Sequence, residues 1–248
     1  MRFAAIADIH GNAAALKAVL ADIAAQGIAT SDIVNLGDCL SGPLEAGGTA
    51  DILVPLGLLT VRGNHDRYLI EHAAGDMHEW EADAFGQLSP QHLDWLRTLP
   101  FDAVFRDVAY LCHARPQDDG TYWLDQVTPE GNVVLRDRQE IEAWAEGIEQ
   151  PLILCGHTHL PRAARLADGR LIVNPGSVGC PAYDDDTPVY HKVEAGSPLA
   201  SYAILEETPV GWSVSFRLVP YDHMTQSQLA GRNRRPTWAA GLATGRLD

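Results

Sequence analysis

The chain has 248 residues, of which 46% are hydrophobic and 21% are charged, and its formal net charge is −15. This apolar content is enough for a sizeable core in one large domain or two small ones. The acidic balance argues against broad electrostatic binding to nucleic-acid backbones or anionic membranes. An anionic substrate therefore needs local positive charge, supplied by metal ions or by individually placed arginines.

The cysteines and the N-terminus indicate the compartment. Four cysteines without CxxC spacing predict buried thiols in a reducing environment, not a disulfide framework. They are Cys39, Cys112, Cys155 and Cys180. The first apolar run stops at Asp8, which is too early for a signal peptide, and no stretch approaches the roughly 20 apolar residues of a membrane span. We therefore expect a cytoplasmic protein without a membrane partner.

The first third of the chain alternates strands and helices. Apolar runs at 3–8, 32–38 and 58–63 predict strands, and residues 12–27 and 44–54 predict helices. In the first helix Asn12 can cap the start and Gly27 the end. This alternation favours a mostly parallel, internally placed sheet.

The rest of the chain is richer in strands. Residues 67–98 look helical, with a new helix start at Ser89-Pro90, and residues 137–148 predict another helix. Strands are expected at 101–105, 108–114, 151–156, 200–207 and 211–219, and a hairpin at 162–176 turns at Asp168-Gly169. We expect one layered α/β domain over residues 1–223.

Three segments lack a clear pattern. Residues 114–136 and 180–200 are rich in proline, glycine and aspartate and predict functional loops, the second being a candidate lid or a surface for a homo-oligomer. Residues 224–248 carry four arginines against one aspartate. We expect either a docking arm or, preferentially, a loosely ordered end.

Five short motifs each follow an apolar, strand-like run. They are DIH at 8–10, GD at 37–38, GNHD at 63–66, CHA at 112–114 and GHTH at 156–159. Open α/β folds bind ligands at the carboxyl ends of their strands, so these motifs are expected to meet at one edge. Each motif alone also fits a helix cap or a turn; their joint order favours a common site.

The side chains of these motifs suit a pair of divalent metals. The set comprises Asp8, His10, Asp38, Asn64, His113, His157 and His159. Imidazole and carboxylate ligands suit Zn, Mn, Fe, Co or Ni, and no thiolate set is evident. In extended backbone, residues i and i+2 point to the same side, so each x-separated pair can converge on one site.

The order DxH, GD, GNHD, H, GHTH resembles the calcineurin-like metallophosphoesterases. The match spans residues 8–159, and NPGSVG at 174–179 is similar to the small bacterial and archaeal members. The resemblance implies a four-layer α-β-β-α sandwich with two central mixed sheets. It also implies that Asp8, His10 and His159 bind one metal, that Asn64, His113 and His157 bind the other, and that Asp38 bridges both. We expect two divalent cations, with manganese favoured.

The implied chemistry is hydrolysis of a phosphate ester by a metal-activated hydroxide that attacks phosphorus. His65 is expected near the leaving group, where an imidazolium can donate a proton, with Asp66 orienting it. Three further residues are candidates for contact with the substrate. Arg62 either meets its anion or forms an exposed salt bridge, and Asn174 and Ser177 either face the phosphate or shape a turn. The remaining histidines, at 72, 78, 92, 191 and 223, are expected on the surface or on helices.

The preferred function is hydrolysis of small phosphodiesters or phosphomonoesters. A Ser/Thr protein phosphatase or a dinucleoside-polyphosphate hydrolase is the alternative, although GDCLSGP lacks the arginine that follows this motif in the protein phosphatases. A non-catalytic scaffold of the same fold is the alternative from another class. The complete set of ligand candidates argues against it, and the charge disfavours a nuclease or any nucleic-acid partner.

Overall fold

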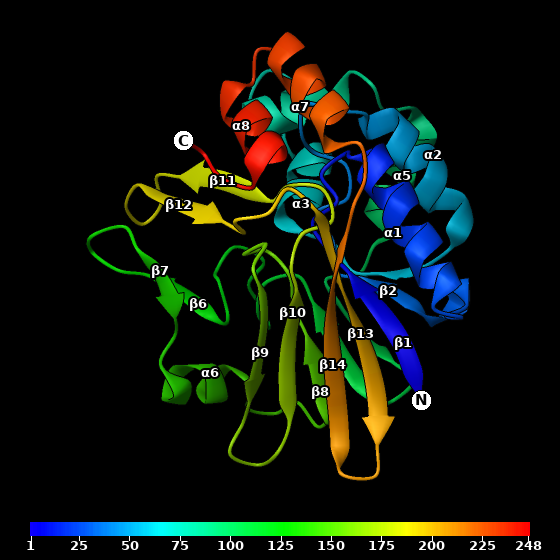
Figure 1. The fold of residues 1–248 in the computed structure, drawn as a ribbon, viewed down its shortest axis with the longest axis vertical. Coiled ribbons are helices and arrows are strands. Elements are labelled where there is room, and N and C mark those ends of the chain that lie inside the picture. Colours follow the sequence, from blue (N-terminus) through cyan, green and yellow to red (C-terminus); the bar gives the residue numbers. More distant parts are fainter.

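The computed structural model describes residues 1–248 and contains two five-stranded mixed sheets that pack face to face (Figure 1). The first sheet has the order β14-β13-β1-β2-β3, from β1 (Arg2–Ile6), β2 (Ile33–Asn35), β3 (Leu59–Thr60), β13 (Ala200–Thr208) and β14 (Gly211–Val219). The second has the order β4-β5-β8-β10-β9, from β4 (Asp102–Phe105), β5 (Ala109–Cys112), β8 (Leu152–Leu154), β9 (Pro161–Arg165) and β10 (Leu171–Pro175). In the first sheet β1, β2 and β3 are parallel, and β13 and β14 continue the sheet in antiparallel pairs. In the second sheet the two inner pairs are parallel and the two edge pairs are antiparallel.

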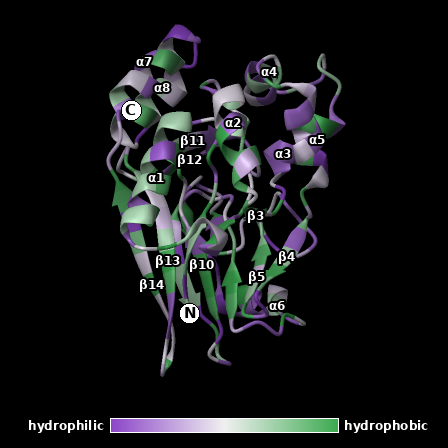
Figure 2. Cartoon of the chain, turned by 90° about the vertical axis from the view of Figure 1, so that its right-hand side faces the viewer, coloured by the Kyte–Doolittle hydropathy of each residue, from purple (hydrophilic) through white to green (hydrophobic).

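Alternation along β1 shows how the layers form. Phe3 and Ala5 face the second sheet, whereas Ala4 and Ile6 face the helices, because successive strand residues point to opposite faces. The helical layer over the first sheet contains α1 (Ala13–Ala25), α2 (Ala46–Leu56) and α5 (Pro90–Thr98), and α6 (Arg138–Trp144) covers the outer face of the second. Hydrophobic residues are concentrated along the central strands (Figure 2). The predicted four-layer α-β-β-α sandwich is confirmed, although its outer layer over the second sheet is thin.

The helical stretch expected at 67–98 is three helices. They are α3 (Asn64–Glu71), α4 (Glu79–Phe85) and α5. Ser89 caps α5 as expected, because its hydroxyl accepts a hydrogen bond from the backbone N–H of His92 at 3.3 Å. Residues 72–78 separate α3 from α4 in the chain, and the two helices contact each other.

The two expected loops contain short hairpins. Residues 114–136 include β6 (Asp125–Val127) and β7 (Val133–Leu135), and residues 180–200 include β11 (Ala182–Asp185) and β12 (His191–Glu194). His191 is buried in β12 at 1% exposure, so the expectation of a surface or helical position is wrong for this histidine. No helix has the length and apolar composition needed to cross a membrane.

The C-terminal segment is two packed helices, α7 (His223–Arg232) and α8 (Pro236–Thr244), so the expectation of a loosely ordered end is wrong. Trp238 and Leu242 lie one turn apart on α8 and are buried against Tyr183 and Val193 of the β11–β12 hairpin. This apolar stripe supplies the burial that holds the segment in place. We call residues 223–248 the C-terminal arm; it lies above β11, at the end of the molecule away from the N-terminus of the chain (Figure 1).

The core between the sheets predicts one stability result. Phe3 is fully buried, and its ring centroid lies 4.9 Å from that of Phe105 and 5.8 Å from that of Trp212. Phe3→Ala is expected to lower the free energy of unfolding in urea by about 3–5 kcal/mol, because it removes these contacts and leaves a cavity. Val210→Ala, at a hairpin position that is 93% exposed, is the control and is expected to change it by less than about 0.5 kcal/mol. Equal effects of the two substitutions would contradict this account of the core.

Candidate metal centre

The loops that follow the central strands contain five residues with a strained backbone conformation. Asp8, His10, Asp38, His157 and His159 have φ values of 54°, 47°, 53°, 71° and 59°. A residue other than glycine avoids this left-handed region, so each such conformation costs on the order of 1–3 kcal/mol and persists only where the surrounding structure enforces it. Hydrogen bonds between loops do so here: the backbone N–H of Asp8 donates to Gly37 O at 3.0 Å, and that of His10 donates to Asp38 O at 3.0 Å. The loops thus turn several polar side chains toward one place.

The first cluster joins Asp8, His10 and His159, whose candidate ligand atoms all lie within 4.8 Å of one another. The Nε2 atoms of His10 and His159 are 3.1 Å apart, and His159 Nε2 is 3.6 Å from Asp8 Oδ1. His159 Nδ1 donates to Cys180 O at 2.7 Å, so its neutral ring carries a lone pair on Nε2. Burial lowers the pKa of His10 to about 3, which keeps that ring neutral as well. A cation between the rings would accept their lone pairs.

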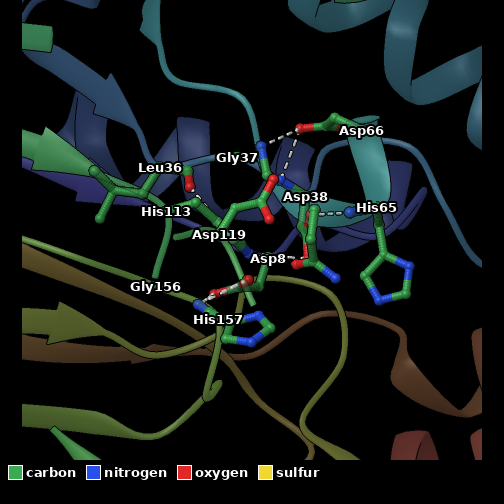
Figure 3. Close-up of polar contacts among 12 residues, drawn as sticks. Asp8, Leu36, Gly37, Asp38, His65, Asp66, His113, Asp119, Gly156 and His157 are labelled. Carbon is green, nitrogen blue, oxygen red and sulfur yellow. Dashed lines mark hydrogen bonds and ion pairs between the residues drawn. The ribbon is translucent and has the colours of Figure 1, made fainter. Parts of the chain in front are cut away.

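The second cluster joins Asp38, His113 and His157 and is completed by Asn64. His113 Nδ1 donates to Leu36 O at 2.7 Å and thereby directs Nε2 toward Asp38 Oδ2 at 3.2 Å and Asn64 Oδ1 at 3.0 Å (Figure 3). This second-layer hydrogen bond is typical of a histidine that binds a metal. Burial lowers the pKa of His157 to about 4 and keeps its ring neutral.

Asp38 lies between the clusters. Its Oδ2 atom is 3.2 Å from His113 Nε2 and 3.8 Å from His10 Nε2 and is buried without a hydrogen-bond partner. A partnerless buried carboxylate oxygen costs free energy unless a cation compensates it. Burial also raises the pKa of Asp8 to about 8, which a neighbouring cation would reverse. The residues present therefore fit two divalent cations with imidazole, carboxylate and amide ligands.

A cavity of about 670 Å³ opens onto these clusters. Asp38, Asn64, His157 and His159 form its floor, and its walls come from α3, α4, the β11–β12 hairpin and the C-terminal arm. Aromatic side chains are frequent in the walls: Tyr68, Trp80, Tyr122, Tyr183, Tyr190 and Trp238. His72 and His78 also line this cavity.

Asp66 does not orient His65, so that expectation is wrong. Its carboxylate accepts hydrogen bonds from the backbone N–H groups of Asp38 and Cys39 at 2.9 Å and of Gly63 at 3.1 Å. Adjacent residues of a helix do not face each other, and the Asp66 carboxylate and the His65 ring point in different directions (Figure 3). Asp66 instead ties the loop that carries Asp38 to the start of α3.

Glu81 is the acidic partner of His65. It is fully buried on α4, and its Oε1 atom accepts a hydrogen bond from His65 Nδ1. Trp80 stacks on the same ring, with centroids 5.1 Å apart and planes inclined by 15°. Burial lowers the pKa of His65, but Asp38 and Glu81 outweigh it, so the net shift is upward. No motif marks Glu81 in the sequence, because its partnership with His65 depends on the packing of α4 against α3.

The three candidates for substrate contact do not line the cavity. Asn174 Nδ2 donates to Gly156 O at 2.7 Å and to Thr158 Oγ1 at 2.9 Å, and its Oδ1 accepts from the backbone N–H of Gly176 at 2.9 Å. This buried amide has no atom left for a phosphate, and it shapes the loop of His157.

Ser177 and Arg62 are also occupied elsewhere. The Ser177 hydroxyl donates to Asp8 O at 2.7 Å and accepts from the backbone N–H of Cys180 at 2.8 Å. Ser177 therefore supports the loop of Asp8, which favours the alternative that it shapes a turn. Arg62 Nη1 lies 4.0 Å from Glu71 Oε1, which favours the salt-bridge alternative for Arg62.

Gly63 gives a test of the position of Asp38. A Cβ atom at Gly63 would lie 2.0 Å from Asp38 Oδ1 and 2.5 Å from Asp38 N, so Gly63→Ala must displace that carboxylate. We expect fewer than two Mn²⁺ bound per chain by elemental analysis, and a smaller rise in melting temperature on adding Mn²⁺, since a ligand that binds only the folded state stabilises it.

The matched control is Gly86→Ala, because a Cβ at Gly86 meets nothing within 4 Å. This variant is expected to bind and respond to Mn²⁺ like the wild type. A folded Gly63→Ala protein that binds two ions with unchanged affinity would remove Asp38 from the bridging position.

Comparisons with known proteins agree with this geometry. A family model described as the calcineurin-like phosphoesterase superfamily domain matches residues 1–196. The crystal structure of a metallophosphoesterase from Sphaerobacter thermophilus is similar at 25% identity, with a TM-score of 0.73 and coverage of 99% of this chain and 100% of that one. An uncharacterized protein of Methanocaldococcus jannaschii is 25% identical over 95% of this chain and 94% of its own length. The chain belongs to the calcineurin-like phosphoesterase superfamily.

Proposed function

We propose that this protein hydrolyses small phosphodiesters or phosphomonoesters at a centre of two divalent metals. The observation that carries the proposal is the position of Asp38, whose buried Oδ2 atom has no hydrogen-bond partner and lies between two clusters that contain histidines. Asp8, His10 and His159 would hold one cation, Asn64, His113 and His157 the other, and Asp38 would bridge them. Two such cations supply an activated water at neutral pH and offset the charge of the phosphate oxygens.

The remaining steps fall to side chains of the cavity. Water attacks phosphorus, the new P–O bond replaces the bond to the leaving oxygen, and that oxygen takes a proton. His65 lines the cavity beside Asn64 and is the proton donor we propose. Because Nδ1 is held by Glu81, Nε2 is the ring atom that remains for the substrate. The Trp80 ring stacks on one face of the imidazole and limits its movement.

The walls of the cavity favour a small substrate. The C-terminal arm and the β11–β12 hairpin both line the space above the metal ligands, so a folded phosphoprotein would have to displace them. A volume of about 670 Å³ lies within the range of small-molecule sites. We propose a cytoplasmic enzyme with manganese as the first metal to test and with no nucleic-acid or membrane partner.

The first test is hydrolysis of a nitrophenyl phosphodiester and a nitrophenyl phosphomonoester with added Mn²⁺. Protein purified without chelator is expected to turn over at least one ester, and Asp38→Asn is expected to reduce kcat by a factor of about 10² or more, because the bridging charge is lost. The ratio of diester to monoester rates then narrows the substrate class. Absence of bound metal and of turnover would favour the scaffold alternative.

The role of His65 predicts a dependence on the leaving group. His65→Ala is expected to reduce kcat by about 10²–10⁴ for a phenyl ester, whose leaving oxygen needs a proton, and much less for a nitrophenyl ester, which leaves as a stable anion. Glu81→Gln is expected to show the same preference with a smaller loss and unchanged metal content. Equal losses for both esters would assign His65 to another role.

A further inference from the structure

Two arginines of the C-terminal arm line the cavity, and they differ in their partners. Arg235 is fully engaged, since its guanidinium binds Asp83 at 2.7 Å and Glu79 at 3.0 Å on α4. The Arg234 side chain is exposed and forms no salt bridge or hydrogen bond within the chain. It is therefore a free positive charge at the wall of a cavity that opens onto the candidate metal centre.

The backbone fixes the position of Arg234. Its φ of 63° and the hydrogen bond from its N–H to Gly231 O at 3.1 Å define the turn between α7 and α8. On one side Asn233 Nδ2 donates to Pro43 O at 2.6 Å, and on the other Arg235 is anchored to α4. Because both neighbours are held, Arg234 is presented to the cavity from a rigid turn.

The start of α8 adds further donors at the same wall. Arg235, Pro236, Thr237 and Trp238 line the cavity in sequence, and no side chain caps this nine-residue helix. The first helical hydrogen bond runs from Ala239 N to Arg235 O, so the N–H groups of Thr237 and Trp238 precede it and have no acceptor in the helix. The first turn of α8 therefore offers backbone donors at the cavity wall.

We propose that Arg234 and the first turn of α8 form a second anion subsite, which binds a phosphate or carboxylate on the leaving-group side of the substrate. A guanidinium and a helix N-terminus both favour an anion. The Trp238 ring lies 4.9 Å from that of Trp80, which stacks on His65, so the subsite borders the proposed proton donor. This inference rests on the proposed function, and its residues lie outside the region matched by the family model, residues 1–196.

Acidic residues limit the ligand to one extra anionic group. Asp184, Asp185 and Asp186 line the same cavity and repel an extended polyanion. The preferred substrate is thus a phosphate ester whose leaving group carries a single second anion within reach of Arg234.

Kinetics on matched esters test the subsite. The esters are 4-nitrophenyl phosphate, its analogue with a ring carboxylate and its analogue with a second phosphate. The wild type is expected to prefer one of the charged analogues, and that preference identifies the anion. Arg234→Ala is expected to raise KM for it about tenfold or more with little change in kcat, and to leave KM for the plain ester unchanged.

Arg232→Ala is the matched control, because Arg232 is an exposed arginine of the same arm that does not line the cavity. It changes the net charge equally and is expected to leave all three KM values unchanged. No preference for either charged ester, or equal effects of the two arginine substitutions, would overturn the subsite.

Binding of inorganic phosphate to chelator-treated protein separates the subsite from the proposed hydrolysis. Without metals, the acidic centre repels phosphate, so calorimetric binding reports the arm alone. We expect binding that weakens about tenfold in Arg234→Ala and is kept in Arg232→Ala, whether or not the enzyme turns over any ester. Absence of binding in the wild type, or binding unaffected by Arg234→Ala, would refute the subsite even in an active enzyme.

Discussion

The centre depends on the buried carboxylate of Asp66. It accepts three backbone hydrogen bonds, from the N–H groups of Asp38, Cys39 and Gly63, and so ties the loop after β2 to the loop after β3. Burial raises the pKa of Asp66 to about 6, and the backbone hydrogen bonds act against that rise. Asp38 and Asn64, which follow different strands, are thereby held at one edge of the sheet. The strained φ values of these loops persist because backbone hydrogen bonds of this kind hold the loops in place.

Much of the fold and centre could be predicted because it is encoded locally. The apolar strand of β1 is followed at once by Asp8 and His10, and the same order recurs at His157 and His159, so strand and motif can be read together. The role predicted for Asp66 was wrong. Asp66 is adjacent to His65 in sequence, but its side chain points in a different direction from α3 and accepts hydrogen bonds from the backbone.

Other parts of the site depend on contacts between distant segments, which the sequence does not reveal. Glu81 reaches His65 only because α4 packs beside α3, and no spacing marks that pair. The C-terminal arm was expected to be loosely ordered because it carries four arginines against one aspartate. The stabilising effect of its apolar residues, among them Trp238 and Leu242, depends on the hairpin that they cover. The same arm forms part of the cavity wall over the candidate metal ligands.

The central claim is that Asp38 lies between two metal ions. Crystals grown with Mn²⁺ and measured at the manganese absorption edge test it directly, since anomalous scattering locates each ion without assumptions about its ligands. We predict two peaks about 3.5–4 Å apart on either side of the Asp38 carboxylate, one beside His10 and His159 and the other beside His113 and His157. A single peak, or peaks remote from Asp38, would contradict the account.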